Sequence, residues 1–363
     1  MLSWLKNRKK ILQLLPSFAE HDAVSNQAVL MNDVFRENGY KPQIYSNYFP
    51  KKYKGIIGEP KFLRDRDFDV AIYHHSIGDP MVELVKTLNI PVILYYHNIT
   101  PADYFEVYNQ RVYELLMQGK KQLLQLKDHV DLGMASSGYN AEELEELGYE
   151  NTEVLPIFFN PDKLDEIRED RKIKQFLDNE HITNLLFVGR FAPNKAHKDL
   201  IKAFYIYYKY YNSMSRLSLV GSYVEMNSYL SEITELIEAL ELESVVHVPG
   251  LVEDEEWKAF YLNSDIFISA SEHEGFFVPA LEANYFGLPI IAYDAGAVKS
   301  TLGGSGLIYE NKKPEVIAEL IHQVLSDKKL NRKLVNLGRK NCRRFEVRKH
   351  KNKLIDIVDE FLK

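Results

Sequence analysis

Short apolar segments alternate with amphipathic helical stretches along the whole chain, and this alternation limits the fold more than any other feature. In the first half, five segments have the composition of buried strands: residues 10–16, 68–75, 91–97, 132–137 and 153–157. Candidate helices lie among them at residues 26–37, 81–88, 104–126 and 141–147. Apolar strands separated by helices are typical of a parallel sheet covered on both faces. We therefore expect an α/β, doubly wound first half.

The same alternation starts again in the second half. Its strand candidates are residues 184–190, 216–222, 245–250, 266–271, 289–294 and 306–310. A chain of 363 residues also exceeds one ordinary core. We predict two Rossmann-like domains, residues 1–160 and 161–342, that face a central cleft, with the chain break at Asn160-Pro161-Asp162.

Composition excludes several classes of protein. The net charge of −7 argues against a nucleic-acid binder, and no apolar run is long enough to span a membrane. The single cysteine, Cys342, excludes an internal disulfide and favours a reducing compartment. Basic clusters at residues 6–10, 51–54, 120–127 and 339–353 have two interpretations: solvated faces, or attraction to an anionic membrane or lipid-linked partner.

Residues 269–294 carry the most informative pattern. A strand runs into the turn Glu274-Gly275-Phe276-Phe277, and Pro279 then favours the start of a helix. Free N–H groups at such a helix start suit a phosphate. Glu282 lies about one turn into the helix, where it and Glu274 could accept hydrogen bonds from hydroxyl groups of one ligand.

A second charged loop lies upstream. Another strand ends in Gly189-Arg190, and Lys195 follows five residues later, ahead of a helix. Arginine offers a planar fork and lysine a point charge, so together they could stabilise negative charge on a departing diphosphate. We expect the nearby His197 and Lys198 to face solvent.

Together these segments resemble the motifs of retaining GT-B glycosyltransferases of family four (glycosyl transferases group 1). The paired glutamates in EGFFVPALEANYFGLPIIA and the glycine-arginine-to-lysine spacing carry the resemblance. It implies a GT-B fold and a metal-independent hexosyltransferase that needs no cofactor, with Arg190, Lys195, Glu274 and His97 as catalytic residues. The donor-binding residues that it implies are Gly189, Gly250, Leu251, Val252, Gly275, Phe276, Phe277, Val278 and Glu282.

The first half resembles the family more loosely. His97 ends a strand at the position where family members often place a histidine near the reacting sugar. The acceptor-side candidates are Asp22, Asn26 and His75, although Asp22 and Asn26 equally suit helix capping. The first strand–helix loop lacks the family's paired glycines, and Lys299-Ser300 stands where the family usually has Pro-Glu. Residues 343–363 resemble the closing helix that returns to the first domain.

The resemblance implies transfer of a hexose from a UDP- or GDP-sugar to a saccharide or lipid-linked acceptor, with retention of configuration. Polysaccharide or glycolipid assembly is the expected pathway. The expected place is the cytoplasm, with peripheral contact at the inner membrane face. No nucleic-acid partner is expected.

Other function classes remain open on the residues alone. A nucleotide-sugar epimerase or a non-catalytic glycan-assembly partner could share the fold. A metal-dependent GT-A transferase would need an acidic motif, and Asp65-Arg66-Asp67-Phe68-Asp69 has the spacing but precedes a strand. No G-x-G-x-x-G follows the first strand of either domain, which argues against a dinucleotide oxidoreductase.

Overall fold

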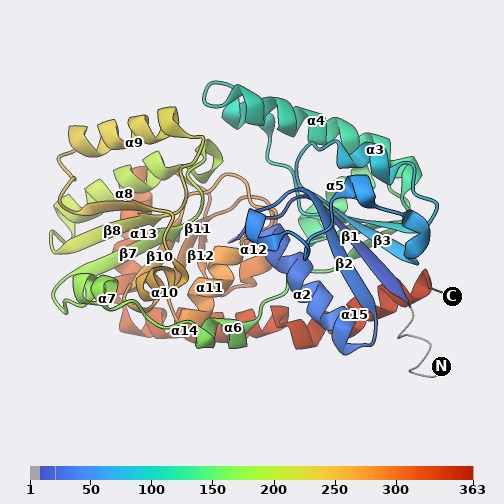
Figure 1. Cartoon of the computed structure of the whole chain (residues 1–363). Coiled ribbons are helices and arrows are strands. Elements are labelled where there is room, and N and C mark those ends of the chain that lie inside the picture. The colour runs from blue at the N-terminus through green and yellow to red at the C-terminus, as the bar shows by residue number, and fades with distance from the viewer. Residues whose placement is uncertain (1–8, 21, 363) are drawn as a thin grey trace. The chain divides into compact units, whose positions relative to one another are not determined.

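The computed structural model describes residues 9–20 and 22–362. The described chain divides into two compact units, each with its own sheet (Figure 1). Unit 1 contains the residues up to Ala102, Arg111–Phe158 and the residues from Phe345 onward. Unit 2 contains Asp103–Gln110 and Phe159–Arg344.

The sheet of unit 1 has six parallel strands in the order β2-β1-β3-β4-β5-β6. Their bounds are β1 Lys10–Ser17, β2 Lys41–Tyr48, β3 Val70–His75, β4 Val92–Tyr96, β5 Leu132–Ala135 and β6 Thr152–Val154. Every residue of β3 and β4 is buried, as expected for inner strands that helices cover on both faces. Strand β2 lies at the edge and alternates buried with exposed residues, which explains why a search for apolar runs misses it.

The helices of unit 1 are α2 Ala23–Glu37, α3 Met81–Val85, α4 Gln110–Leu126, α5 Gly138–Glu146 and α15 Val347–Glu360. Helices α2 and α15 share one hydrophobic core with the strands. Phe35 and Val358 lie in that core beside Ile72 and Tyr95. The end of the chain is therefore an integral part of the first unit.

The sheet of unit 2 repeats the plan with six parallel strands in the order β12-β11-β10-β7-β8-β9. Their bounds are β7 Thr183–Val188, β8 Ser215–Val220, β9 Val246–Gly250, β10 Ile266–Ser269, β11 Ile290–Tyr293 and β12 Leu307–Tyr309. Strands β7 and β10 are neighbours, with Leu186 opposite Phe267. The loops that follow these two strands consequently begin side by side at the carboxyl edge of the sheet.

The helices of unit 2 are α6 Pro161–Glu166, α7 Arg171–Leu177, α8 His197–Tyr210, α9 Asn227–Ala239, α10 Asp254–Leu262, α11 Val278–Phe286, α12 Val298–Leu302, α13 Pro314–Ser326 and α14 Lys328–Cys342. Helix α11 has Pro279 in its first turn and ends at Gly287, whose φ of 83° is left-handed. The 3₁₀ segments are Lys51–Tyr53, Pro60–Phe62, Asp65–Asp67, Ala102–Phe105, Lys127–His129, Pro193–Lys195 and Arg343–Phe345. The expected α/β fold with two parallel sheets is confirmed.

Several predicted elements differ in extent, and two of these differences have a clear structural reason. The helix expected over residues 104–126 begins at Gln110, and Asp103–Gln110 groups with unit 2. The Tyr108 hydroxyl donates to Glu232 at 2.9 Å, which gives this segment a polar partner on α9. The strand expected over residues 153–157 ends at Val154, two residues before Pro156, which has no N–H for a sheet ladder.

Candidate active site

Lys195 and Glu274 form an ion pair at the carboxyl edge of the second sheet. The ammonium nitrogen of Lys195 lies 2.6 Å from Oε1 of Glu274. Lys195 follows β7 and Glu274 follows β10, so the pairing of these strands brings together residues that are distant in sequence. The side chain of Glu274 is 9% exposed and that of Lys195 21% exposed, so the pair is screened only partly by water.

Hydrogen bonds also join the two loops directly. The N–H of Glu272 donates to the carbonyl oxygen of Asn194 at 2.7 Å. The amide of Asn194 returns a bond to the carbonyl of His273 at 3.3 Å, and the Ser271 hydroxyl lies 3.3 Å from the carbonyl oxygen of Asn194. These bonds hold the loops at a fixed separation, which preorganises the ion pair.

The turn after Glu274 leads into the start of α11. Phe277 is left-handed, with φ 78°, and no side chain caps the helix. Among the described residues, neither the N–H of Phe277 nor that of Val278 has a protein acceptor. Free N–H groups at a helix start attract anions, and this start lies within four residues of the Glu274 carboxylate.

The loop after β11 supports this turn. The N–H of Ala297 donates to the carbonyl oxygen of Glu274 at 2.8 Å. Gly296 has φ 57°, and a Cβ on it would lie 2.4 Å from that oxygen. Only glycine allows the two backbones to approach so closely.

Glu282 lies on α11 and has a buried tyrosine as its partner. The hydroxyl of Tyr261, a fully buried residue, donates to Oε2 of Glu282 at 2.8 Å. Burial raises the pKa of Glu282 to about 7, and the bond from Tyr261 opposes that rise. The Glu282 side chain can therefore exchange a proton near neutral pH. The partnership with Tyr261 is absent from the sequence pattern because 21 residues separate the two.

Arg190 follows Gly189, the first residue after β7. The residue is exposed, and its guanidinium carbon lies 5.9 Å from the centre of the Phe105 ring. Phe105 belongs to the segment Asp103–Gln110, which groups with unit 2. Arg190 thus lies in the same loop after β7 as Lys195, and its aromatic neighbour Phe105 could not be inferred from the sequence.

Glycines lie at the carboxyl ends of three adjacent strands of the second sheet: Gly189 and Gly221 follow β7 and β8, and Gly250 is the last residue of β9. A Cβ on Gly221 would lie 1.9 Å from the carbonyl oxygen of Gly189, so these backbones are in close contact. The N–H of Gly221 donates to the carbonyl of Gly250 at 3.0 Å. Leu251 is 63% exposed and Val252 is half-buried. The glycines thus allow the backbones of the three strand ends to pack closely at the carboxyl edge of the sheet.

His97 follows β4 in unit 1 and contacts a second histidine. Its Nε2 lies 2.9 Å from Nδ1 of His74, and its Nδ1 is buried with no partner among the described residues. Burial lowers the pKa of His97 well below its usual value, and burial also lowers the pKa of His74 to about 3. Both rings are accordingly uncharged near neutral pH.

His75 has a structural role rather than the predicted acceptor-side role. Its Nδ1 lies 3.1 Å from the Tyr73 hydroxyl and its Nε2 3.0 Å from the carbonyl oxygen of Gly119. The residue is fully buried, so both ring nitrogens are used inside the core. Period-two geometry explains this, because His74 and His75 point to opposite faces of β3.

Asp22 and Asn26 are the other two acceptor-side candidates. Oδ2 of Asp22 accepts a bond from the N–H of Ser25 at 2.8 Å and caps α2. Asn26 is exposed and makes no side-chain hydrogen bond with the described residues. Helix capping, the alternative reading of Asp22, is the role that the structure gives it.

His197 does not face solvent as expected. It is fully buried, and its ring stacks on Phe191 with centroids 4.2 Å apart. Burial lowers its pKa to about 3. Lys198 forms an ion pair with Glu232 on α9.

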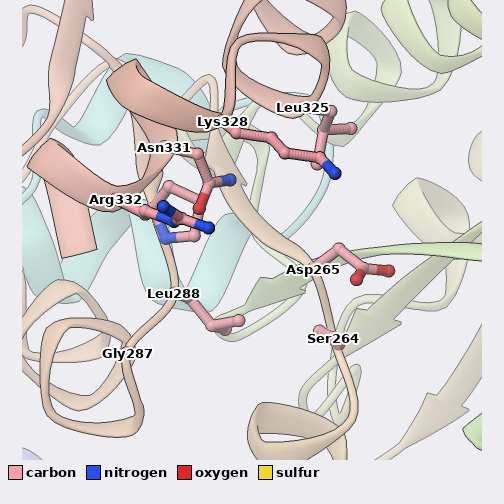
Figure 2. Close-up of a pocket in the computed structure, with 9 residues that line it drawn as sticks. Ser264, Asp265, Gly287, Leu288, Leu325, Lys328, Asn331 and Arg332 are labelled. Carbon is pink, nitrogen blue, oxygen red and sulfur yellow. The ribbon is translucent and has the colours of Figure 1, made fainter.

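Figure 2 shows a pocket at the opposite edge of the second sheet. Asp265 and Pro289 line it, and they immediately precede β10 and β11. Lys328 and Arg332 of α14 supply positive charge. None of the predicted site residues lines this pocket, so it is separate from the ion pair at the carboxyl edge.

Acidic residues near β3 are used locally. One carboxylate oxygen of Asp65 accepts from the N–H of Arg66 at 2.8 Å and the other from Asn89 at 3.1 Å. Within the described residues, no group of three or more His, Cys, Asp or Glu side chains could hold a metal ion.

No helix of residues 9–20 and 22–362 is long and apolar enough to cross a membrane. Most of the basic cluster at residues 6–10 lies outside the described chain.

Comparison with known proteins finds a family match within the second unit. Residues 167–341 match the family model described as Glycosyl transferases group 1. The chain is 23% identical, over 274 residues, to an uncharacterized 41.2 kDa protein in the cps region of Klebsiella pneumoniae; this covers 72% of the chain and 70% of that protein. It is 28% identical, over 188 residues, to the capsular polysaccharide biosynthesis glycosyltransferase CapM of Staphylococcus aureus, covering 51% of the chain and 47% of CapM.

Solved structures share the fold over the whole length. HepE of Anabaena, solved in complex with UDP and glucose, superposes with a TM-score of 0.72 at 16% identity, covering 97% of this chain and 100% of that one. The chain therefore has the GT-B fold. The family match covers residues 167–341, and the likeness to HepE concerns the fold.

Proposed function

Starting from a GT-B fold whose second unit matches the group 1 glycosyl transferases, we propose that the protein transfers a hexose from a UDP- or GDP-sugar to a saccharide or lipid-linked glycan, with retention of configuration. The observation that carries this proposal is the Lys195–Glu274 ion pair beside the uncapped start of α11. A cation and free backbone N–H groups complement a diphosphate, and a carboxylate complements sugar hydroxyls.

Leaving-group stabilisation is the main chemical role of this edge of the sheet. As the bond between the sugar C1 and the diphosphate oxygen breaks, negative charge grows on the diphosphate. Lys195, Arg190 and the N–H groups of Phe277 and Val278 would stabilise that charge without a metal ion. The acceptor hydroxyl then bonds to C1, and its proton passes to the departing phosphate oxygen on the same face.

Glu274 and Glu282 would orient the donor. Glu274 is held by Lys195, and Tyr261 occupies one oxygen of Glu282. The remaining carboxylate oxygens can accept hydrogen bonds from hydroxyl groups of the donor. Fixed orientation of the reactants is a large part of what an enzyme supplies for such a transfer.

Carbohydrate assembly is the proposed setting. CapM is named for capsular polysaccharide biosynthesis, and the Klebsiella relative for the cps region. HepE binds UDP and glucose, which favours a nucleotide sugar as donor. The basic residues of α14 and of residues 343–353 favour an acceptor at an anionic membrane surface.

A donor panel tests the proposal. UDP-glucose, UDP-galactose, GDP-mannose and their free nucleotides are screened by thermal shift, and the donors that bind are then incubated with glycan acceptors in the presence of a chelator. We expect one nucleotide sugar to stabilise the protein and to give a free nucleoside diphosphate plus a longer glycan with an α anomer. Interconversion of sugars with no nucleotide released would instead identify an epimerase. Binding without any turnover would favour a non-catalytic partner.

A further inference from the structure

A buried chain of polar side chains runs from helix α2 to His97 in unit 1. Nε2 of Gln13 lies 2.9 Å from the carbonyl oxygen of Ala28 and 2.6 Å from Oδ1 of Asn32. Oε1 of Gln13 lies 2.8 Å from Nε2 of His74. The other nitrogen of His74, Nδ1, lies 2.9 Å from Nε2 of His97.

The direction of every hydrogen bond in this chain follows from its first member. A backbone carbonyl can only accept, so the Gln13 nitrogen must face Ala28 and the Gln13 oxygen must face His74. His74 therefore donates from Nε2. With its single proton on Nε2, neutral His74 accepts at Nδ1 from the Nε2–H of His97.

The same reasoning defines the state of His97. Its proton is on Nε2, so Nδ1 carries a lone pair. That atom is buried and has no partner among the described residues. A buried acceptor left unsatisfied is costly, and a hydrogen-bond donor from outside the described residues would therefore be favourable at this atom.

The surroundings keep His97 neutral and fixed in place. The His74 and His97 rings lie 7° from parallel, and the Tyr95 ring centre lies 4.2 Å from that of His97. The N–H of His97 donates to the carbonyl of His75 at 3.0 Å, which continues the ladder between β3 and β4. The next residue, Asn98, is left-handed with φ 79°, a conformation that asparagine tolerates better than most residues.

We propose that Gln13 and His74 are positioning residues that hold His97 as the Nε2–H tautomer, so that its Nδ1 accepts a hydrogen bond from a hydroxyl group of the sugar substrate. The sugar contact rests on the function proposed above, whereas the tautomer is a property of the ligand-free protein. A hydroxyl group suits this nitrogen because it donates a hydrogen bond and carries no charge.

Nitrogen NMR of the ligand-free full chain tests the tautomer directly. With ¹⁵N-labelled histidine and a His97→Gln variant for assignment, we expect protonated Nε2 and unprotonated Nδ1 at His97 at pH 7. A His97 ring protonated at Nδ1, or at both nitrogens, overturns the relay. This measurement needs no donor and no folded relay variant, so its outcome is independent of the proposed function.

Variants test whether the relay matters for the reaction. Gln13→Leu and His74→Phe interrupt it, and Gln122→Leu is the matched control. Gln122 is likewise a buried glutamine, and its side chain bonds to the N–H of Asp79 at 3.0 Å and to the carbonyl oxygen of Asp79 at 2.9 Å. We expect the relay variants to lower kcat/KM about tenfold, as for one lost hydrogen bond in the transition state, and the control to change it by less than about twofold at similar thermal stability.

Two results would contradict the proposal in different ways. If the relay variants are as active as the Gln122→Leu control, Gln13 and His74 do not position His97 for the reaction. The Nδ1 resonance of His97 is compared with the nucleotide sugar bound and with its free nucleotide bound. If the two ligands shift the resonance equally, the sugar does not contact Nδ1. If no nucleotide sugar binds, the proposed function and the sugar contact fail together, while the NMR result still decides the tautomer.

Discussion

The ammonium nitrogen of Lys195 lies 2.6 Å from Oε1 of Glu274, although 79 residues separate them in the chain. The pair exists because β7 and β10 are neighbours in the sheet and the two following loops share hydrogen bonds. It joins the two sequence motifs into one site, and it couples the stability of that site to its charge.

Removing Lys195 alone should destabilise unit 2 because it leaves the Glu274 carboxylate buried without its cation. We expect Lys195→Met to lower the free energy of unfolding by about 2 kcal/mol and the double variant Lys195→Met/Glu274→Gln to recover about half of it. Urea unfolding of the wild type, both single variants and the double variant measures the coupling. A double variant less stable than Lys195→Met would contradict an ion pair of this kind.

Arg190 should matter for turnover and little for stability, because it is exposed. We expect Arg190→Ala to reduce kcat by at least about tenfold, since a charged donor to the leaving group is lost. The control is Arg332→Ala, an exposed arginine beside the pocket of Figure 2. Steady-state kinetics with the donor found in the panel makes the comparison. Equal activity of the two variants would contradict the role assigned to Arg190.

Donor binding should depend on pH through Glu282, whose pKa is raised to about 7 by burial. The ionised carboxylate is the better acceptor, so donor affinity should rise as pH increases through that value. Tyr261→Phe removes a bond that favours ionisation and should therefore shift the midpoint to higher pH. Calorimetric titrations between pH 6 and 8.5 measure both curves, and an unchanged midpoint in the variant would exclude this coupling.

Gly296 should not tolerate a side chain, because its Cβ would meet the carbonyl oxygen of Glu274 at 2.4 Å. We expect Gly296→Ala to cost more than about 2 kcal/mol of unfolding free energy and to abolish transfer. Gly304→Ala is the control, since Gly304 also has a positive φ, 84°, but has open space around its Cβ position. The loss of stability in the Gly304→Ala control measures the backbone strain alone, which we expect to be about 1 kcal/mol. Equal losses in thermal unfolding would show that the close contact is unimportant.

Stability of unit 1 should fall in acid because of His75, whose pKa burial lowers to about 4. The unfolded chain protonates this residue near pH 6.5, so between pH 6.5 and 4 it binds more protons than the folded one. The contribution of uncharged His75 to the free energy of unfolding is therefore fully present above pH 6.5 and is lost as the pH falls toward 4. His75→Gln keeps a donor for the carbonyl of Gly119 and does not titrate. At pH 7.5 we expect the variant to have a lower free energy of unfolding than the wild type. At pH 4.5 this difference should be smaller by about 2 kcal/mol. Urea unfolding at both pH values measures it.

Local patterns in the sequence were sufficient for the fold and for the loop residues of unit 2. Alternating apolar runs and helices predict two parallel sheets, and the turn Glu274–Phe277 with Pro279 predicts the start of α11. These features are local because each depends on the residues of one strand, turn or helix.

Partnerships across elements needed the tertiary structure. The sequence gives no reason to pair Tyr261 with Glu282, Phe105 with Arg190, or Gln13 and His74 with His97, because strand order and helix packing bring these residues together. It also cannot tell whether His74 or His75 faces His97, since neighbours on a strand point to opposite faces. Residue types and local geometry thus determined which groups are available, and the packing of distant segments decided which of them meet.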